Sequence, residues 1–364
     1  MLGLATRMDF SATDDMNKPS AFCIDGTCIA PGQRALVNLQ LAQLFTGTPV
    51  TLPVHVLHGR KPGPVLFVSA AIHGDELNGV EIIRRLLKQR TLHNLRGTLL
   101  AVPMVNLYGV LDHSRYLPDR RDLNRSFPGH ETGSMAARLA HTFMSRIVAR
   151  CTHGIDLHTG AIGRANLPQI RANLDDAPTE QLARAFGVPV LINSSLRDGS
   201  LREAAAEAGV RMLLYEAGEA LRLEELAIRA GVAGVVGVMR AIGMLTPGHP
   251  RKVRAEPFIA RSSLWVRAPE SGLCLPRVGL GARVNKGQVL ALIADPVTGH
   301  EDPVEASASG IVIGRSNQPL VHEGEALFHI GRFEAPKLVA AGIQSFHSEL
   351  QPIPSEPMEP LPIV

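Results

Sequence analysis

A histidine and a glutamate, His73 and Glu76, stand three residues apart immediately after the apolar run 65–72. The run has the composition of a buried strand, and α/β sheets present their chemistry in loops at the carboxyl ends of such strands. An imidazole nitrogen and a carboxylate oxygen are ligands that suit zinc. Most pairs with this spacing are solvated surface residues, so a metal site requires a third ligand and a base.

The best candidate for the third ligand is His158, the last residue of the apolar segment 155–158. Catalytic zinc sites use three protein ligands and keep one position open for water. Asp156 lies two residues earlier, so on a strand it shares a face with His158 and could orient the imidazole. An isolated histidine in such a place is more often a core residue, and only the coincidence of several polar strand ends favours a ligand.

A candidate general base, Glu216, ends the apolar run 212–215 and is followed by Ala217 and Gly218. A carboxylate near zinc can take a proton from water and pass it to a leaving amine. Glu219 is the alternative, but there it would begin a helix, where acidic residues ordinarily complement the dipole. The pattern therefore favours Glu216.

A long irregular segment, 107–133, contains arginines alternating with acidic residues. Long loops without structure are unusual inside a compact domain unless they have a function. Asn124 and Arg125 together present a fork of donors that matches a substrate carboxylate. The alternative is a solvated cluster of ion pairs, which is common.

The elements that would position these residues alternate between strand and helix up to about residue 244. This alternation predicts an α/β fold with a mixed, mainly parallel sheet flanked by helices. The segment 59–64 is predicted to be a turn because its prolines interrupt a ladder. Strands are expected at 35–39, 50–57, 65–72, 98–105, 154–158 and 211–216, and helices near 80–87, at 134–150, from Ser200 and at 220–244.

After Pro247 the helical patterns give way to short strands separated by turns at the spacing of a small barrel or sandwich. We therefore expect four parts: a disordered segment 1–20, a catalytic domain 21–250, an all-β domain 255–332 and an extended proline-rich tail 333–364. The β domain resembles the barrel-sandwich of biotinyl and lipoyl carriers. Its hairpin tip, 295–299, lacks the lysine of a carrier, which favours a structural role at the active-site rim or at an oligomer contact.

Composition restricts the possible partners. The net charge is +3, and the arginines are scattered rather than massed, which does not favour nucleic-acid binding. No apolar run reaches the ~18 residues of a membrane span, and no signal peptide is recognisable. Four dispersed cysteines are expected to be reduced, so the sequence predicts a cytoplasmic protein.

Four motifs together resemble the succinylglutamate desuccinylase/aspartoacylase family, which is related to the zinc carboxypeptidases. They span roughly residues 50–245, and their combination is more specific than any single motif. This resemblance implies a zinc carboxypeptidase-like fold. The motifs are His73-Gly-Asp-Glu76, Asp122-Leu-Asn-Arg125 with Phe127-Pro-Gly129, Asp156-Leu-His158-Thr-Gly160 and Glu216-Ala-Gly218.

The resemblance also implies roles in a metal site. His73, Glu76 and His158 would bind one zinc ion per subunit, and Glu216 would be the general base. Within the family, deacetylases of N-acetyl-diaminobutyrate are among the similar members.

Further roles concern the substrate. By the same resemblance, Asn124 and Arg125 would hold the carboxylate of the substrate, and Arg115 would face the oxyanion. The spacing leaves Arg120 and Arg121 as alternatives to Arg115.

The expected reaction is hydrolysis of the amide bond of a small N-acyl amino acid, with a metal-bound water activated by Glu216. One alternative is a metallocarboxypeptidase, which would need an open groove for a peptide in place of a small closed pocket. Another is a non-catalytic binding protein on the same fold. A homo-oligomer is possible, and the acyl group and the amine are left open.

Overall fold

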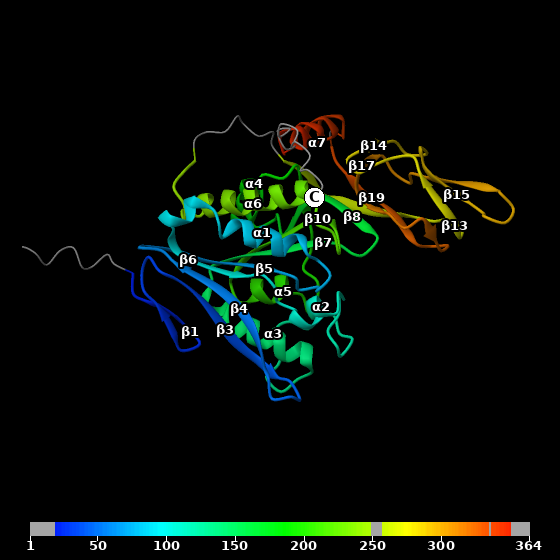
Figure 1. The fold of residues 1–364 in the computed structure, drawn as a ribbon. Coiled ribbons are helices and arrows are strands. Elements are labelled where there is room, and N and C mark those ends of the chain that lie inside the picture. Colours follow the sequence, from blue (N-terminus) through cyan, green and yellow to red (C-terminus); the bar gives the residue numbers. More distant parts are fainter. Residues whose placement is uncertain (1–18, 249–256, 335, 351–364) are drawn as a thin grey trace, which may run out of the picture.

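The computed structural model describes residues 19–248, 257–334 and 336–350, and among them thirteen strands form one central sheet (Figure 1). Two short strands, β9 (Val190–Asn193) and β11 (Phe258–Ala260), pair with each other beside β8, and β14 (Arg283–Val284) pairs with β17. The order of the others is β12 (Ser262–Arg267), β19 (Ala326–Arg332), β17 (Gly310–Ser316), β8 (Arg164–Ala172), β10 (Arg211–Glu219), β7 (His153–Gly160), β5 (Lys61–Ala70), β6 (Arg96–Val102), β4 (Pro49–His58) and β3 (Arg34–Gln43).

The sheet is mixed, as the sequence predicts, but its parallel part is limited. Strands β6, β5, β7 and β10 run parallel in the middle, as do β8, β9 and β11. The pairs on both flanks are antiparallel, including β3 with β4 and β17 with β8. Parallel strands bring their carboxyl ends to one edge of a sheet, so the middle of this sheet is where polar strand ends can meet.

Helices cover both faces of the sheet (Figure 1). One buried cluster joins the sheet to α1 (Asn78–Leu86), α4 (Ala177–Phe186) and α6 (Glu225–Ala241). A second cluster, on the other face, joins it to α3 (Met135–Arg146) and α5 (Leu201–Glu207). The remaining helices within residues 19–248 are short: α2 (Leu107–Leu111), η2 (Arg90–Asn94), η3 (Leu123–Arg125) and η4 (Val148–Arg150).

The expected strands of the first part are present, with one correction at 59–64. The structure has a strand there, because β5 begins at Lys61. Lys61 pairs with Arg96, but the regular pairing resumes only at Val65 with Thr98. Pro62 and Pro64, which lack backbone N–H groups, lie within this irregular stretch, where no ladder donor is required.

The segment between His158 and Ser200, where no element was expected, contains β8, α4 and β9. Helix α4 begins with Asp176, whose carboxylate accepts from the Thr179 backbone N–H, and has a proline in its first turn. An aspartate cap followed by proline is a helix-start signal that was present in the sequence.

The strands after residue 257 are short, as predicted, but they do not form a separate sheet throughout. Four of them, β16 (Glu301–Glu305), β15 (Val289–Ala294), β13 (Gly272–Pro276) and β18 (Leu320–Val321), make a small antiparallel sheet. Strands β12, β19 and β17 instead extend the central sheet through β8. The boundary predicted at 255 falls outside the described residues, and the division into domains stays a prediction.

The tail predicted to be extended is helical over α7 (Pro336–Leu350). Val339, Ile343 and Phe346 recur at helical spacing and are buried. Phe346 joins the buried cluster of α1, α4 and α6, and the other two pack against β8, β9, β11 and β17. This apolar face explains why the segment forms a helix. The rest of the tail, 351–364, and residues 1–18 of the expected disordered segment lie outside the described residues.

The prediction of four reduced cysteines is wrong for one pair, because Cys23 and Cys28 form a disulfide. They are directly opposite each other in the hairpin of β1 (Phe22–Ile24) and β2 (Thr27–Ile29). The two-residue turn is Asp25-Gly26, with positive φ at both positions, which is a favoured hairpin sequence. Recognising that turn would have placed the two cysteines side by side.

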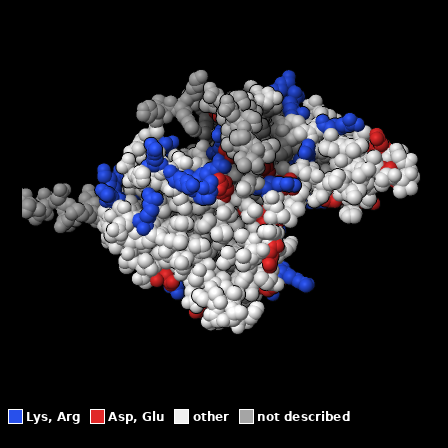
Figure 2. Space-filling view, viewed as in Figure 1, with Lys and Arg blue, Asp and Glu red and all other residues white. Residues whose placement is uncertain are grey.

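Charged side chains on the face shown in Figure 2 include a mixed group of blue and red over the region of α1. There Arg84 and Arg85 pair with Glu81, and Arg85 also pairs with Glu225. Guanidinium groups neutralised in this way do not form a uniformly basic patch. Among the described residues, no helix combines the length and the apolar composition needed to cross a membrane.

Gly154, in β7, lies against the ring of Phe67, and a Cβ at position 154 would come within 2.3 Å of ring carbons. Phe67 is fully buried and packs edge-on against Phe143. We therefore expect Gly154→Ala to lower the free energy of unfolding by about 1–3 kcal/mol, since overpacked cores are strained. Denaturant unfolding measures this change.

The control is Gly279→Ala, because a Cβ at Gly279 has no atom within 4 Å. This variant is expected to unfold like the unmodified protein. Equal stability of the two variants would contradict the packing argument.

Candidate metal centre

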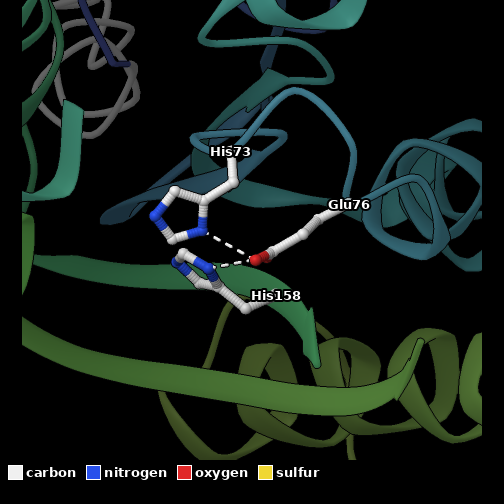
Figure 3. A group of neighbouring side chains, drawn as sticks. All are labelled: His73, Glu76 and His158. Atoms are coloured by element: carbon white, nitrogen blue, oxygen red, sulfur yellow. Dashed lines mark hydrogen bonds and ion pairs between the residues drawn. The ribbon is translucent and has the colours of Figure 1, made fainter. Parts of the chain in front are cut away.

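Three side chains far apart in the sequence converge in the structure: His73, Glu76 and His158 (Figure 3). Their ligand atoms all lie within 4.8 Å of one another, and all three residues are buried. Nδ1 of His73 is 2.7 Å from Oε1 of Glu76, and Nδ1 of His158 is 2.8 Å from Oε2 of the same carboxylate. Two imidazole nitrogens and a carboxylate oxygen at such separations are a donor set that fits zinc.

The convergence follows from the parallel pairing of β5 with β7, in which Ala70 lies opposite Leu157. His158 is the next residue of β7, and His73 and Glu76 lie in the loop that leaves β5. Gly74 permits the tight course of this loop, because a Cβ there would meet the Gly109 backbone at 1.9 Å. The site therefore depends on a close backbone contact between this loop and α2.

Carboxylates hold the outer nitrogen of each imidazole. Nε2 of His158 is 2.6 Å from Oδ2 of Asp156, whose other oxygen accepts a hydrogen bond from Ser69 Oγ at 2.7 Å. Nε2 of His73 is 3.2 Å from Oδ1 of Asp122. Such contacts fix ring orientation and leave Nδ1 of each ring turned to the inside of the cluster, which is the arrangement expected around a bound metal.

The charges of this cluster stabilise one another. Burial raises the pKa of Glu76, but His73 and His158 outweigh it and hold that pKa far below its usual range. For His158, burial lowers the pKa, whereas Asp156 and Glu76 raise it well above the ordinary value. Glu76 is thus ionised in this cluster.

Glu216 lies in β10 opposite His158 of β7, and both line a pocket of about 410 Å³. Its Oε2 accepts a hydrogen bond from Asn166 Nδ2 at 2.8 Å, and its Oε1 pairs with Arg171 Nε at 3.2 Å. The competing residue, Glu219, ends the same strand and does not begin a helix, contrary to the expectation. Its two oxygens accept from the Gly163 N–H and from Asn317 Nδ2, and it does not line the pocket.

Comparison with known proteins agrees with these motifs. The model of the succinylglutamate desuccinylase/aspartoacylase catalytic domain matches residues 62–242. This range contains every residue of the cluster and the predicted base. The chain belongs to the succinylglutamate desuccinylase/aspartoacylase family.

Relatives of the chain cover most of its length. The N-alpha-acetyl-L-2,4-diaminobutyric acid deacetylase of Halomonas elongata is 28% identical over 295 residues, which are 76% of this chain and 84% of that protein. A succinylglutamate desuccinylase/aspartoacylase structure from Rhodobacter sphaeroides has a TM-score of 0.74 at 25% identity, covering 83% of this chain and 95% of the other. The ectoine utilization protein EutE (DoeB) from Ruegeria pomeroyi shares the fold, with a TM-score of 0.72 at 24% identity over 82% of this chain and 94% of its own.

Of the three arginines considered for the oxyanion position, the structure brings only Arg115 to the cluster. Its Nη1 is 3.6 Å from Glu76 Oε1, and its Nη2 is 3.0 Å from Asp122 Oδ2. Arg120 and Arg121 are exposed and do not line the pocket. Of these three arginines, only Arg115 therefore lies beside the cluster and in the pocket wall.

Asn124 and Arg125 both line the pocket, as the carboxylate-binding interpretation requires. The Oδ1 of Asn124 accepts a hydrogen bond from the Leu201 backbone N–H at 3.0 Å, so its Nδ2 remains as the donor for a ligand. The Arg125 guanidinium donates to the carbonyl of Asn124. This local contact holds the Arg125 guanidinium beside the Asn124 backbone.

Several pocket residues were missed from the sequence. Most come from strands whose pairing is long-range, and two come from α5 and the loop before it. Together they add positive charge and aromatic surface to the wall. They are Arg164, Asn166, Arg171, Arg197, Arg202, Trp265 and His329.

Proposed function

We propose that this chain hydrolyses the amide bond of a small N-acyl amino acid in a zinc-dependent reaction. The observation that carries the proposal is that His73, Glu76 and His158 lie in the wall of the pocket that also contains Glu216. Membership of the family supports the proposal, as does the Halomonas elongata relative, which is a deacetylase of an N-acetylated amino acid.

The metal would be held by the two Nδ1 atoms and the Glu76 carboxylate. Zinc there would polarise the acyl carbonyl and lower the pKa of a water molecule. The carboxylates of Asp122 and Asp156 hold the two imidazoles in the orientation this requires.

Glu216 is the residue that moves the proton. Asn166 and Arg171 fix the position of its carboxylate at the pocket wall. In the proposed reaction it accepts a proton from the attacking water and returns it to the nitrogen as the C–N bond breaks, giving a carboxylic acid and a free amine. Asn124 and Arg125 would hold the carboxylate of the amino acid so that the amide reaches this position.

The pocket has room for a small acylated amino acid, and substrate tests separate this function from that of a carboxypeptidase. A volume of about 410 Å³, with Trp265 and His329 in the wall, suits a small acylated amino acid. The test is a panel of N-acyl amino acids and blocked dipeptides, with amine release and zinc content measured on the purified protein. Cleavage of peptides alone would replace the proposal with the carboxypeptidase, and binding without hydrolysis of any compound would favour the binding protein.

Arg115 is proposed to donate to the oxyanion that forms on the acyl carbon. We expect Arg115→Gln to lower kcat/KM by about 10²–10³-fold, the usual effect of removing one such donor. Steady-state kinetics measures this loss, and zinc analysis shows whether the metal is retained. The control is Arg121→Gln, whose side chain is 63% exposed and which should keep full activity. Equal losses in both variants would rule out this role for Arg115.

The cytoplasmic location and a homo-oligomeric state remain part of the proposal. The Cys23–Cys28 disulfide is of a kind that reducing compartments disfavour, so it weighs against the cytoplasm. Labelling of free thiols at the moment of cell lysis shows whether these two cysteines are oxidised in the cell. Reduced cysteines would support the cytoplasmic location, and oxidised cysteines would contradict it.

A further inference from the structure

The backbone turns sharply where β5 ends, two residues before His73 of the metal cluster. Ala71 has a φ of +52°, in the left-handed region, and its side chain is fully buried. Residues other than glycine adopt this region rarely, because their Cβ comes too close to a carbonyl oxygen. The other non-glycine residues with positive φ in the described part of the chain are all exposed: Asp25, His113, Arg120 and Leu221. A buried left-handed alanine next to a functional site persists only because its surroundings enforce it.

Two successive carbonyl groups show what the left-handed backbone changes. The Ala70 carbonyl oxygen accepts a hydrogen bond from the Val105 N–H at 3.0 Å. The Ala71 carbonyl oxygen accepts one from the Asn106 N–H at 2.9 Å, so both donors belong to the segment that follows β6. In a regular strand successive carbonyls alternate between the two neighbouring strands, and an extended Ala71 would direct its carbonyl toward β7. The turn at Ala71 therefore moves one acceptor from the β7 side to the β6 side.

The donor that this turn releases on the β7 side is the backbone N–H of Thr159. Continued parallel pairing of β5 with β7 would place Ala71 opposite His158. A carbonyl in a parallel ladder accepts from the residue after its partner, which here is Thr159. In the structure the Thr159 N–H instead donates to Oε2 of Glu76 at 3.0 Å. A side chain of the metal cluster thus takes the place that a strand carbonyl would have had.

The Thr159 N–H fixes the orientation of the Glu76 carboxylate. Glu76 is 2% exposed, and its carboxylate lies between two imidazoles (Figure 3). Its Oε1 faces His73, and its Oε2 contacts both Nδ1 of His158 at 2.8 Å and the Thr159 N–H. Groups that hold a metal ligand from behind set its direction and contribute to metal affinity. The backbone at the end of β7 therefore has such a role for Glu76.

Asn106 supplies the surroundings that hold Ala71 in its conformation. It is fully buried, and its backbone N–H is the donor to the Ala71 carbonyl. Its side-chain Oδ1 accepts a hydrogen bond from the Gly109 N–H of α2 at 2.9 Å. Gly109 is also the residue against which Gly74, in the loop that leaves β5, packs. The left-handed residue, Asn106 and the loop are thus one connected arrangement.

We infer that Ala71 is a positioning residue of the metal centre, because its left-handed backbone keeps a β5 carbonyl away from Thr159 and leaves the Thr159 N–H to hold Glu76. This inference rests on the proposed function, in which Glu76 binds the metal. It gives position 71 a requirement opposite to that of an ordinary strand residue. Residues that adopt left-handed backbone should preserve metal binding, and β-branched residues, which avoid it, should weaken metal binding.

The first test compares the unfolding temperatures of Ala71→Gly and Ala101→Gly in the chelator-treated protein. Ala101 is equally buried but lies within the ladder of β6, where glycine lowers stability. Glycine adopts left-handed backbone without steric cost, so Ala71→Gly should instead raise the unfolding temperature by about 2 °C. The Ala71 methyl group is in none of the buried apolar clusters, so little packing is lost. A decrease in both variants would show an extended Ala71 and overturn the inference.

The second test measures the zinc affinity of Ala71→Asn and Ala71→Thr by competition with a chelating dye. Both side chains are polar and similar in size, so they disturb the buried position to a similar extent. Asparagine is among the residues that most often adopt left-handed backbone, whereas threonine is β-branched and avoids it. We expect Ala71→Asn to keep most of the affinity and Ala71→Thr to lose about 10–100-fold. Circular dichroism at the same temperature shows whether both variants are folded.

The outcomes separate this inference from the proposed function. Equal zinc affinity of folded Ala71→Asn and Ala71→Thr would remove the role of Ala71 and leave the metal centre in place. Absence of zinc binding by the unmodified protein would contradict the proposed function together with the inference.

If Ala71→Thr does not fold, exchange of the Thr159 amide proton decides. An N–H that donates to Glu76 should exchange about tenfold faster in Glu76→Ala, since it loses its acceptor. An unchanged exchange rate would mean that this N–H has another acceptor, and it would overturn the inference.

Discussion

Glu216→Gln is expected to lower kcat by about 10²–10⁴-fold while zinc stays bound, since proton transfer by a positioned carboxylate contributes this much. Glutamine has nearly the same shape and can still accept the hydrogen bond from Asn166 Nδ2. It cannot take up a proton from water. Glu216 is not among the three residues of the metal cluster, so its loss should leave the metal content unchanged. Metal analysis and single-turnover kinetics on the same preparation measure both quantities.

The control is Glu219→Gln, three residues later in the same strand. Glu219 accepts from the Gly163 N–H and from Asn317 Nδ2, and its side chain lies outside the pocket wall. Its replacement should affect stability more than kcat. If Glu216→Gln keeps its activity and Glu219→Gln loses it, the base has been assigned to the wrong carboxylate.

The residues of the metal cluster could be found from the sequence because each follows a recognisable buried strand. The apolar runs before His73 and His158 identify two strands, and the parallel pairing of β5 with β7 then brings their ends together. Asp156 was expected to share a face with His158, and its carboxylate does contact that imidazole. Residues two apart on a strand share a face, so this contact can be predicted from one short segment of the sequence.

The rest of the pocket depends on contacts that no local pattern encodes. Trp265 and His329 reach the site only because β17 pairs with β8, and a pairing between segments about 150 residues apart leaves no periodic trace in either one. Arg164 and Arg171 belong to β8, which carries Pro168 in its interior and so reads poorly as a strand. The sequence therefore predicted the three clustered side chains better than the rest of the pocket wall.

Two further differences have local explanations. The helix α7 replaced an expected extended tail because its apolar residues match a helical face that finds a core to cover. The disulfide was missed because cysteine counting ignored the Asp25-Gly26 turn that sets Cys23 opposite Cys28. In both cases the deciding signal was spacing, whereas composition was misleading.

His158→Ala is expected to remove zinc from the protein and to reduce turnover to the uncatalysed background. With the imidazole gone, only His73 and Glu76 of the cluster remain, and catalytic zinc requires three protein ligands. Chelation of the unmodified protein should have the same effect and should be reversed by added zinc. Because a metal that binds only the folded state stabilises it by about 4 kcal/mol at a thousandfold excess over Kd, chelation should also lower the unfolding temperature.

The matched control is His153→Ala, which removes an imidazole from the same strand, β7, at its opposite end. His153 is half-buried and its Nδ1 contacts Thr152, away from the metal cluster. That variant should keep zinc, turnover and the response to chelation. Alanine at 158 also leaves the Asp156 carboxylate without its imidazole partner, so a loss of stability alone would not establish a metal ligand. The decisive result is the metal content of folded protein: zinc retained by folded His158→Ala would exclude the proposed centre, since no other group of this kind was found among the described residues.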